Sequence, residues 1–294
     1  MIQLSIEPLA ARTRPEERSR VEWIRSGEWL ESQDITLPML PARAAGVMQL
    51  AMDPEVSAGR IAIVVSKDQV LASLVLRLAN SAFSAPASEI TNVGDAVVRV
   101  GTRAVRNVVI ASCLVSRLKD PQIYGSHGAD LTDHSIGTAY LARLIAEQVG
   151  ESPDDAFLYG LLHDIGKLLI LKLARDTSFR YGPPALDGDI ETLIIEKHAE
   201  FGGYLLEQWK LPATLHDPVV WHHRPDRAEI DPRAATVAYA ANRLAHRYGF
   251  GCRPDGFDPL SDLRCKSLEL NQKRLEELDT RAPGLFEVAR QIIR

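Results

Sequence analysis

The chain has 294 residues, a formal net charge of −5, and a composition of 46% hydrophobic and 25% charged residues. This length can bury a substantial core, and three widely separated cysteines without a CxxC pair argue against a disulfide framework or a zinc ribbon. The acidic balance argues against a nucleic-acid surface over the whole molecule. We expect a cytoplasmic protein without membrane association, because the apolar runs are shorter than the roughly 20 residues that span a bilayer and the charged first residues do not resemble an export signal.

The spacing of apolar residues predicts an all-α fold, because helical periodicity recurs along the chain and convincing strand alternation does not. Residues 1–33 read as an N-terminal extension with one amphipathic helix over 15–32. Two prolines in the segment Leu37–Pro41 predict an extended entry to the main domain. Further helices are expected over residues 42–52, 57–66, 67–80, 94–100 and 102–118.

Turn-forming residues cluster at 120–128 and predict a boundary inside the domain 34–248, between a first helical lobe at 34–120 and a second lobe at 121–248. Helices are expected in the second lobe over 131–149, 155–174, 190–210, 212–221 and 234–248. The tail 249–294 is expected to be helical over 261–279 and 285–293, with a break at Pro283-Gly284. We expect this tail to pack back on the second lobe.

A His-Asp pair lies in the apolar segment Gly160-Leu161-Leu162-His163-Asp164-Ile165-Gly166-Lys167, which is expected to be helical. Buried aspartates are rare unless they are paired or coordinated, so Asp164 needs a partner. Adjacent residues on a helix point about 100° apart, yet an imidazole and a carboxylate can still reach one cation from a single face. The pair therefore predicts a metal site.

Further donors in the second lobe could share this site, namely His134, His198, His222 and His223, with Asp130 four residues before His134. Imidazoles together with carboxylates suit Fe, Mn, Zn or Ni. A water made acidic by such a metal could attack phosphorus, with Lys167 offsetting the developing charge. The alternative is that these rings are core histidines that donate to backbone carbonyls. The remaining three, His127, His216 and His246, are expected to be surface or structural residues.

Arginines at i, i+4 and i+7 suggest a second binding surface in the first lobe: Arg99, Arg103 and Arg106. If Gly101 only bends the helix, their guanidinium groups form a stripe that suits phosphate or carboxylate. The alternative is a solvated helix face. The segment Asn80–Phe83 is interpreted structurally, with polar side chains that cap helix ends.

These motifs together resemble the HD superfamily of metal-dependent phosphohydrolases, whose signature is similar to Gly160–Lys167, and in particular its HDOD branch of bacterial signalling proteins. The motifs similar to the HDOD branch occur in the family's order: Leu37–Pro41, Leu78–Phe83, Ile90-Thr91, Ala96–Gly101 and Val105–Asn107. The resemblance covers roughly residues 34–248. It implies an all-helical fold in which an N-terminal lobe packs on an HD-type lobe.

The related HD-GYP branch of cyclic-dinucleotide phosphodiesterases implies which residues would hold the metal. The positions that match its ligands are Asp130, His134, His163, Asp164, His198, His222 and His223. Asn242 stands where the closing aspartate is expected, and the Gly-Tyr-Pro motif is absent from Arg224–Arg227. An asparagine offers a carbonyl oxygen, but it has no negative charge and cannot act as a base. Such a site can bind metal and still be inactive.

Three functions are compatible with this sequence. The leading hypothesis is a cytoplasmic signal-transduction module without catalysis, or with weak catalysis, that binds a signalling protein or a nucleotide second messenger. The alternative is a metal-dependent phosphohydrolase, in which Asp164 and Lys167 are the catalytic residues. The third is a scaffold whose histidines belong to the core.

Overall fold

The computed structural model describes residues 19–31, 42–51, 53, 55–81, 88–118, 120, 123–125, 127–175 and 185–293. All regular elements in these ranges are helices, which confirms the predicted all-α fold. No helix in this part of the chain combines the length and the apolar character needed to cross a membrane. The elements in chain order are α1 (Arg20–Ser26), η2 (Glu28–Glu31), α2 (Ala42–Ala51), α3 (Ala58–Ser66), α4 (Gln69–Ala79), α5 (Val93–Val100), α6 (Thr102–Leu118), α7 (His127–Val149), α8 (Pro153–Leu162), α9 (Ile165–Arg175), α10 (Asp187–Gln208), α11 (Ala213–Trp221), η3 (Pro225–Arg227), α12 (Pro232–Tyr248), α13 (Leu263–Ser267) and α14 (Gln272–Ile293).

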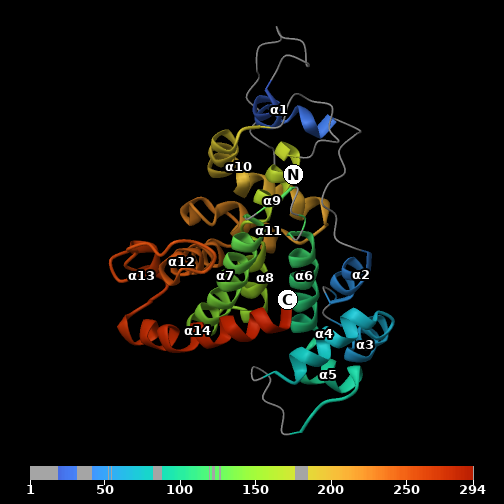
Figure 1. Cartoon of the computed structure of the whole chain (residues 1–294). Helices are drawn as coiled ribbons and strands as arrows, with labels where there is room; N and C mark the ends of the chain where they lie inside the picture. Colours follow the sequence, from blue (N-terminus) through green and yellow to red (C-terminus); the bar gives the residue numbers. More distant parts are fainter. Residues whose placement is uncertain are drawn as a thin grey trace.

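Helices α2 to α6 pack around a small hydrophobic cluster of their own (Figure 1). Its fully buried members are Val47, Ile61, Val65, Val75, Ala79, Ala96, Val97, Val105 and Val109. Side chains of Ser57, Asp68 and Asn92 accept hydrogen bonds from backbone N–H groups in the first turns of α3, α4 and α5. These caps satisfy donors that a helix start leaves unpaired.

The side chain of Asn80 caps the end of α4, as the sequence predicts. The Asn80 side chain donates to the carbonyls of Leu76 at 3.0 Å and Ile90 at 2.8 Å, and accepts from the Ile90 N–H at 2.8 Å. The end of α4 is therefore tied to the segment that leads into α5. The expected anchor Phe83 lies outside the described residues.

A second and larger hydrophobic cluster surrounds α7, which packs against α8, α12 and α14 (Figure 1). Helices α7 and α8 are in close contact at Gly160. A Cβ atom at this position would lie 2.9 Å from the Ala139 Cα and 2.9 Å from the Thr138 carbonyl oxygen. Only a glycine avoids this clash without moving the backbone, so the glycine before the His-Asp pair sets the distance between two core helices.

The expected single helix over 155–174 is wrong, because the structure has two helices with His163 and Asp164 at the break between them. The two helices pack on different partners. Gly160 places α8 against α7, whereas a Cβ at Gly166 of α9 would lie 1.9 Å from a backbone oxygen of α10. The break allows α8 to pack on α7 and α9 to pack on α10, and it places the His-Asp pair between α8 and α9.

The structure also corrects the expectations for both ends of the chain. Near the N-terminus, α1 ends at Ser26, because the following Gly27 has a φ of 77° and stops the helix well before the expected end. In the tail, α14 continues through Pro283, although a break was expected there. The buried side chains of Leu278, Ala282 and Phe286 lie on both sides of this proline, and their packing holds the helix continuous. The tail packs back on the helices around α7, as expected.

Replacing Leu278 of α14 tests how much the tail contributes to the fold. Leu278 is fully buried in the large hydrophobic cluster, so Leu278→Ala is expected to lower the free energy of unfolding by about 2–4 kcal/mol. The matched control is Leu263→Ala, because the Leu263 side chain is 80% exposed. Urea denaturation of both variants measures the difference, and equal stabilities would contradict the packing of the tail.

Candidate metal centre

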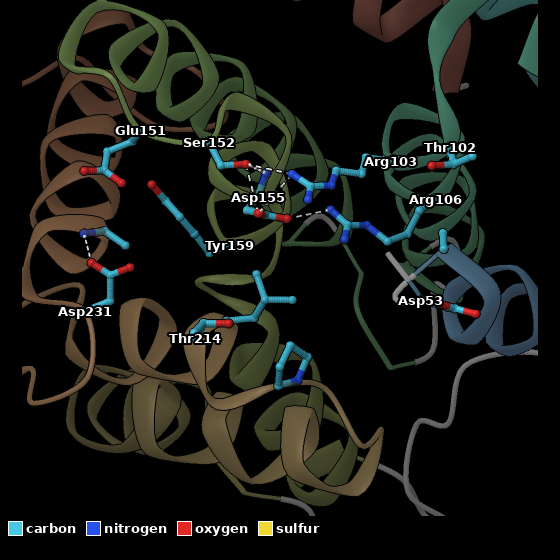
Figure 2. A pocket seen from close by; sticks show the side chains of 14 residues that line it. Asp53, Thr102, Arg103, Arg106, Glu151, Ser152, Asp155, Tyr159, Thr214 and Asp231 are labelled. Carbon is cyan, nitrogen blue, oxygen red and sulfur yellow. Dashed lines mark hydrogen bonds and ion pairs between the residues drawn. The ribbon is translucent and has the colours of Figure 1, made fainter. Parts of the chain in front are cut away.

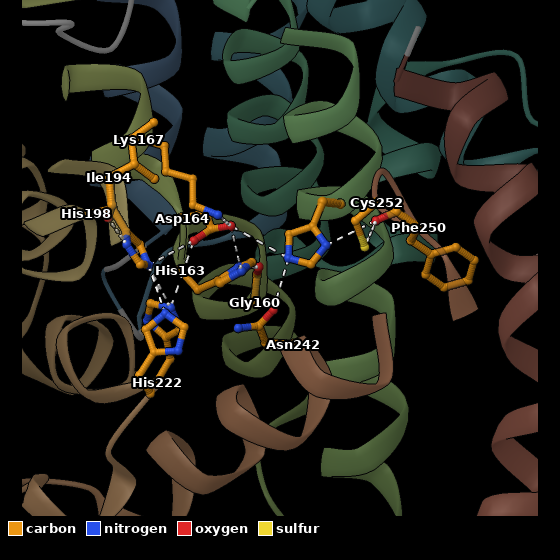
Figure 3. A network of polar contacts seen from close by, with 12 residues as sticks. Gly160, His163, Asp164, Lys167, Ile194, His198, His222, Asn242, Phe250 and Cys252 are labelled. Carbon is orange, nitrogen blue, oxygen red and sulfur yellow. Dashed lines mark hydrogen bonds and ion pairs between the residues drawn. The ribbon is translucent and has the colours of Figure 1, made fainter. Parts of the chain in front are cut away.

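Helices α7 to α12 bring histidines and one carboxylate to a single point inside the protein (Figure 3). Asp164 lies at the centre, in the break between α8 and α9, and is 2% exposed. The imidazoles around it are those of His134, His163, His198, His222 and His223. Centroids of neighbouring rings in this group are 4.0 to 5.2 Å apart. The structure therefore brings together five of the histidines that the sequence singles out.

Four of these rings present Nε2 to the carboxylate of Asp164. The Oδ1 atom lies 3.3 Å from Nε2 of His198 and 3.9 Å from Nε2 of His222. The Oδ2 atom lies 3.2 Å from Nε2 of His163 and 3.6 Å from Nε2 of His134. The two oxygens of one carboxylate thus face two different sets of imidazole nitrogens.

Backbone carbonyls determine which nitrogen of three rings carries the proton. Nδ1 donates to Gly160 O at 2.7 Å in His163, to Ile194 O at 2.6 Å in His198, and to Val219 O at 2.7 Å in His222. A carbonyl only accepts, so in the neutral ring the proton lies on Nδ1 and the lone pair lies on Nε2. These lone pairs point towards the centre, as they do in histidines that ligate a metal.

Several acceptor atoms consequently face one another across the centre. Nε2 of His198 lies 3.3 Å from Nε2 of His222 and 3.0 Å from Nε2 of His223. Nε2 of His134 lies 3.0 Å from the Oδ1 atom of Asn242. A proton on His223 or a turned Asn242 amide satisfies one contact each. Bound cations would satisfy such contacts, because imidazole nitrogens and an amide oxygen can each coordinate a metal.

Burial keeps the imidazoles in the neutral form that metals require. Desolvation lowers the pKa of His134 to about 3 and that of His198 to about 4, although the carboxylate of Asp164 opposes the shift. Desolvation and the neighbouring histidines hold the pKa of His222 well below its usual value. All three rings are therefore uncharged near neutral pH.

The carboxylate of Asp164 stays ionised although it is buried. Burial by itself raises the pKa of this group, but His163 and Lys167 together outweigh that effect and hold the pKa well below the usual value. Lys167 Nζ lies 2.5 Å from Asp164 Oδ2, and its side chain is 27% exposed. The centre thus combines a negative oxygen donor with neutral nitrogen donors, which suits a divalent transition metal.

The described residues fit such a metal in two adjoining groups. The ligand atoms within each group lie within 4.8 Å of one another, and the groups are His134, His163 and Asp164, and His198, His222 and His223. Nε2 of His163 is buried and makes no hydrogen bond in the described structure, although its Nδ1 is anchored. A buried nitrogen lone pair without a donor is costly, and metal coordination would use it.

A close helix contact places His198 at the centre. A Cβ atom at Gly166 would lie 1.9 Å from the carbonyl oxygen of His198 and 2.5 Å from the amide nitrogen of Gly202. Any larger residue at this position would push α10 away from α9. The glycine of the His-Asp-Ile-Gly-Lys motif therefore sets the position of a histidine that lies far away in sequence.

Asp130 is the predicted ligand that the structure does not bring to the centre. It lies in the first turn of α7, is exposed, and belongs to no potential metal-binding group among the described residues. The loop after α12 packs over this part of the helix, since a Cβ at Gly251 would lie 2.0 Å from the Asp130 carbonyl oxygen and 2.6 Å from the His134 amide nitrogen. Helical spacing alone placed Asp130 beside His134 and could not foresee this loop.

Two residues near the centre were missed by the sequence analysis. His246 was expected to be a surface or structural residue, yet its ring centroid lies 4.8 Å from that of His134. Together with Cys252 these two histidines form a third potential metal-binding group. The spacing contained a signal for His246, because it lies one turn after Asn242 on α12 and shares its face. Cys252 had no such signal.

A cavity of about 680 Å³ opens beside the centre. Its wall includes Asp164, Lys167, His198, His223, Arg224, Arg227, Asn242 and His246. This volume lies within the range of roughly 300–1,000 Å³ that is typical of small-molecule sites. A ligand in the cavity would therefore reach both the carboxylate and the surrounding cationic side chains.

The three arginines of the first lobe do not form one continuous stripe. Gly101 has φ 84° and separates α5 from α6, so Arg99 lies on a different helix from Arg103 and Arg106. Arg106 is 2% exposed and lies 3.1 Å from Oδ1 of Asp155, whereas Arg103 lies 3.7 Å from Oδ2 (Figure 2). Arg103 and Arg106 line a cavity of about 380 Å³ that Arg99 does not line. A ligand at this surface stays a prediction.

The fold and the centre define the class of protein: an all-helical domain with an HD-type cluster of histidines around a buried aspartate. The HDOD domain family matches residues 37–225, which is more than half of the chain, and the chain belongs to this family.

Two curated relatives match parts of the chain. An uncharacterized protein of Treponema pallidum is 27% identical over 217 residues, which cover 69% of this chain and 41% of that protein. Ribonuclease Y of Fervidobacterium nodosum is 31% identical over 155 residues, which cover 53% of this chain and 25% of that enzyme. The chain therefore spans less than half the length of either relative.

Solved structures share the fold. An HDOD domain protein of unknown function from Geobacter sulfurreducens has a TM-score of 0.70 at 22% identity, covering 93% of this chain and 98% of that one. A proposed metal-dependent phosphohydrolase from Shewanella amazonensis has a TM-score of 0.68 at 17% identity, covering 94% and 100%. A proposed signal transduction protein from Marinobacter aquaeolei has a TM-score of 0.66 at 23% identity, covering 99% and 64%. At these identities the likeness concerns the fold alone.

The buried histidines predict acid sensitivity of the metal-free protein. His134 and His198 have folded-state pKa values of about 3 and 4, whereas an unfolded histidine has a pKa of about 6.5. A pKa that folding lowers stabilises the fold above the unfolded value, and this contribution is lost as the pH falls towards the folded value. The free energy of unfolding in chelator should therefore fall steadily below about pH 6.5. Urea denaturation at a series of pH values measures how steeply the free energy of unfolding falls, and His134→Gln should make this fall less steep. The same pH dependence in the variant would contradict the lowered pKa of His134.

Proposed function

We propose that this chain is a cytoplasmic bacterial signal-transduction module that holds a divalent transition metal and binds a phosphate-bearing, nucleotide-like ligand without turning it over. The observation that carries the proposal is the set of carbonyl-anchored imidazoles around the ionised carboxylate of Asp164. Fe, Mn, Zn or Ni suits this donor set. The residues that would hold the metal are His134, His163, Asp164, His198, His222 and His223, with Asn242 as a neutral oxygen donor.

The side chains around the cavity of about 680 Å³ support a phosphate-bearing ligand. Lys167 lies at its wall next to Asp164, and the exposed residues Arg224 and Arg227 line the same space. Ammonium and guanidinium groups are the usual partners of phosphate oxygens. A nucleotide in this cavity would touch α9, α10, α11 and α12 together, so its binding would favour one packing of these helices.

Asn242 supports a binding role over catalysis. Among the described residues, the two groups of donors around Asp164 contain a single carboxylate. Asn242 contacts His134 through its amide and adds no negative charge. A centre with one anionic donor neutralises less of the charge of its metal, and the amide cannot accept a proton from water. Such a centre holds a ligand more readily than it activates a nucleophile.

A metal-dependent phosphohydrolase is the second candidate, and Lys167 favours it. A divalent metal at this centre would supply Lewis acidity towards a phosphate oxygen. Lys167 is part-exposed at the cavity wall, where its ammonium group can offset the charge that develops on a phosphate. Asp164 holds this ammonium group in place through its Oδ2 atom.

Metal analysis tests the centre itself. Purified full-length protein is expected to contain a transition metal, and Asp164→Asn should lose most of it because the variant removes the central negative charge. Asp130→Asn is the matched control, since Asp130 is exposed and lies in none of the donor groups. Elemental analysis of the three proteins measures the content. Equal losses in both variants, or a wild-type protein without affinity for any of these metals, would reject the proposal.

Calorimetry and product analysis distinguish binding from hydrolysis. With cyclic di-GMP as probe, the manganese-loaded protein should bind the nucleotide and release no product, and Lys167→Ala should weaken binding because it removes a cation from the cavity. Lys172→Ala, on the same helix, is the control. If the wild type hydrolyses the nucleotide, and if this activity rises in Asn242→Asp and vanishes in His163→Ala, the chain is a phosphohydrolase instead. If the protein does not bind cyclic di-GMP, the proposed nucleotide-like ligand is rejected.

A further inference from the structure

A thiol lies beside the histidine centre at a position outside the HD-type ligand set. Ligand atoms of Cys252, His246 and His134 lie within 4.8 Å of one another. His246 is in the last turn of α12, one turn after Asn242, so this helix face continues from one donor group to the next. Both Cys252 and His246 are partly exposed, which gives an ion a path from solvent.

The loop that carries Cys252 is built against α7. Gly251 has φ 65°, and a Cβ atom there would lie 2.6 Å from the amide nitrogen of His134, so the loop can approach the helix this closely only with glycine. The carbonyl of Phe250 lies 3.1 Å from Nδ1 of His134 and also accepts from Sγ of Cys252 at 3.4 Å (Figure 3). The thiol therefore has a defined place next to the ring.

The Phe250 side chain anchors the same loop from the other side. Its ring stacks on that of Phe286 of α14, with centroids 4.2 Å apart. A Cβ atom at Gly137 of α7 would lie 2.4 Å from the Phe250 ring, so the aromatic ring fills a space that only glycine leaves. Contacts with two helices thus fix the backbone on which Cys252 sits.

We propose that Cys252, His246 and His134 form a separate site for a thiophilic divalent cation of the zinc class. One sulfur and two nitrogen donors select zinc-like ions over magnesium or calcium, and three protein donors leave one position of a tetrahedral site for solvent. The site goes beyond the proposed function, because it needs neither the nucleotide ligand nor Asp164. It shares only His134 with the histidine centre, so this one imidazole lies between the histidine centre and the proposed thiol site.

Cobalt titration of the reduced protein tests the site, because a cobalt–thiolate bond adds a charge-transfer band in the near ultraviolet that cobalt with only nitrogen and oxygen donors lacks. The wild type should show the near-ultraviolet band, and zinc should abolish it by displacement. Cys252→Ser should lose this band and keep the visible absorption of cobalt at the histidine centre. His246→Gln should require more cobalt to reach the same band.

Two further variants make the result decisive. Cys113→Ala removes a buried thiol from the first-lobe cluster and should leave the band unchanged. Asp164→Asn should keep the near-ultraviolet band and lose only the visible absorption that comes from cobalt at the histidine centre, because only this centre depends on the carboxylate. Absence of the band in the wild type at saturating cobalt, its persistence in Cys252→Ser, or its loss in Asp164→Asn would each overturn the inference. Visible absorption without the band would leave the proposed metal centre standing.

Discussion

Asp164 carries a negative charge that is buried between the helices of the histidine centre. An ionised carboxylate inside a protein is costly unless partners compensate for its lost hydration. Lys167 supplies a positive charge 2.5 Å away, and four imidazole nitrogens face the two oxygens. The nitrogens of His163, His198 and His222 cannot donate while backbone carbonyls hold these rings through Nδ1. A bound cation would satisfy these facing acceptors, and this is the physical basis for the proposed metal centre.

The histidines can surround Asp164 only because the helices that carry them pack very closely. Gly160 sets the approach of α8 to α7, and Gly166 sets the approach of α9 to α10. Between them, the helix ends and restarts at His163 and Asp164. The glycines flanking the His-Asp pair thus do no chemistry themselves, but they determine where His134 and His198 stand relative to the carboxylate.

An ion pair connects the first group of helices to the helices of the centre. Arg106 of α6 is buried and contacts Asp155 near the start of α8, and His163 follows directly after the end of the same helix. A change in how α6 packs on α8 would therefore displace α8 and, with it, His163 at the end of that helix. This connection gives a physical route by which a signalling domain could couple its two helical groups.

The helical class, most of the helices and most of the residues around Asp164 could be predicted from the sequence, because apolar periodicity and polar donors in apolar segments are local properties. The helix break at the His-Asp pair, the continuation of α14 through Pro283 and the exposure of Asp130 depend on packing between distant segments and could not be predicted. Contacts between segments far apart in sequence, such as Gly166 with α10 and Gly251 with α7, have no local signature. For the same reason, spacing could place His246 on a helix face, but only packing brought Cys252 beside it.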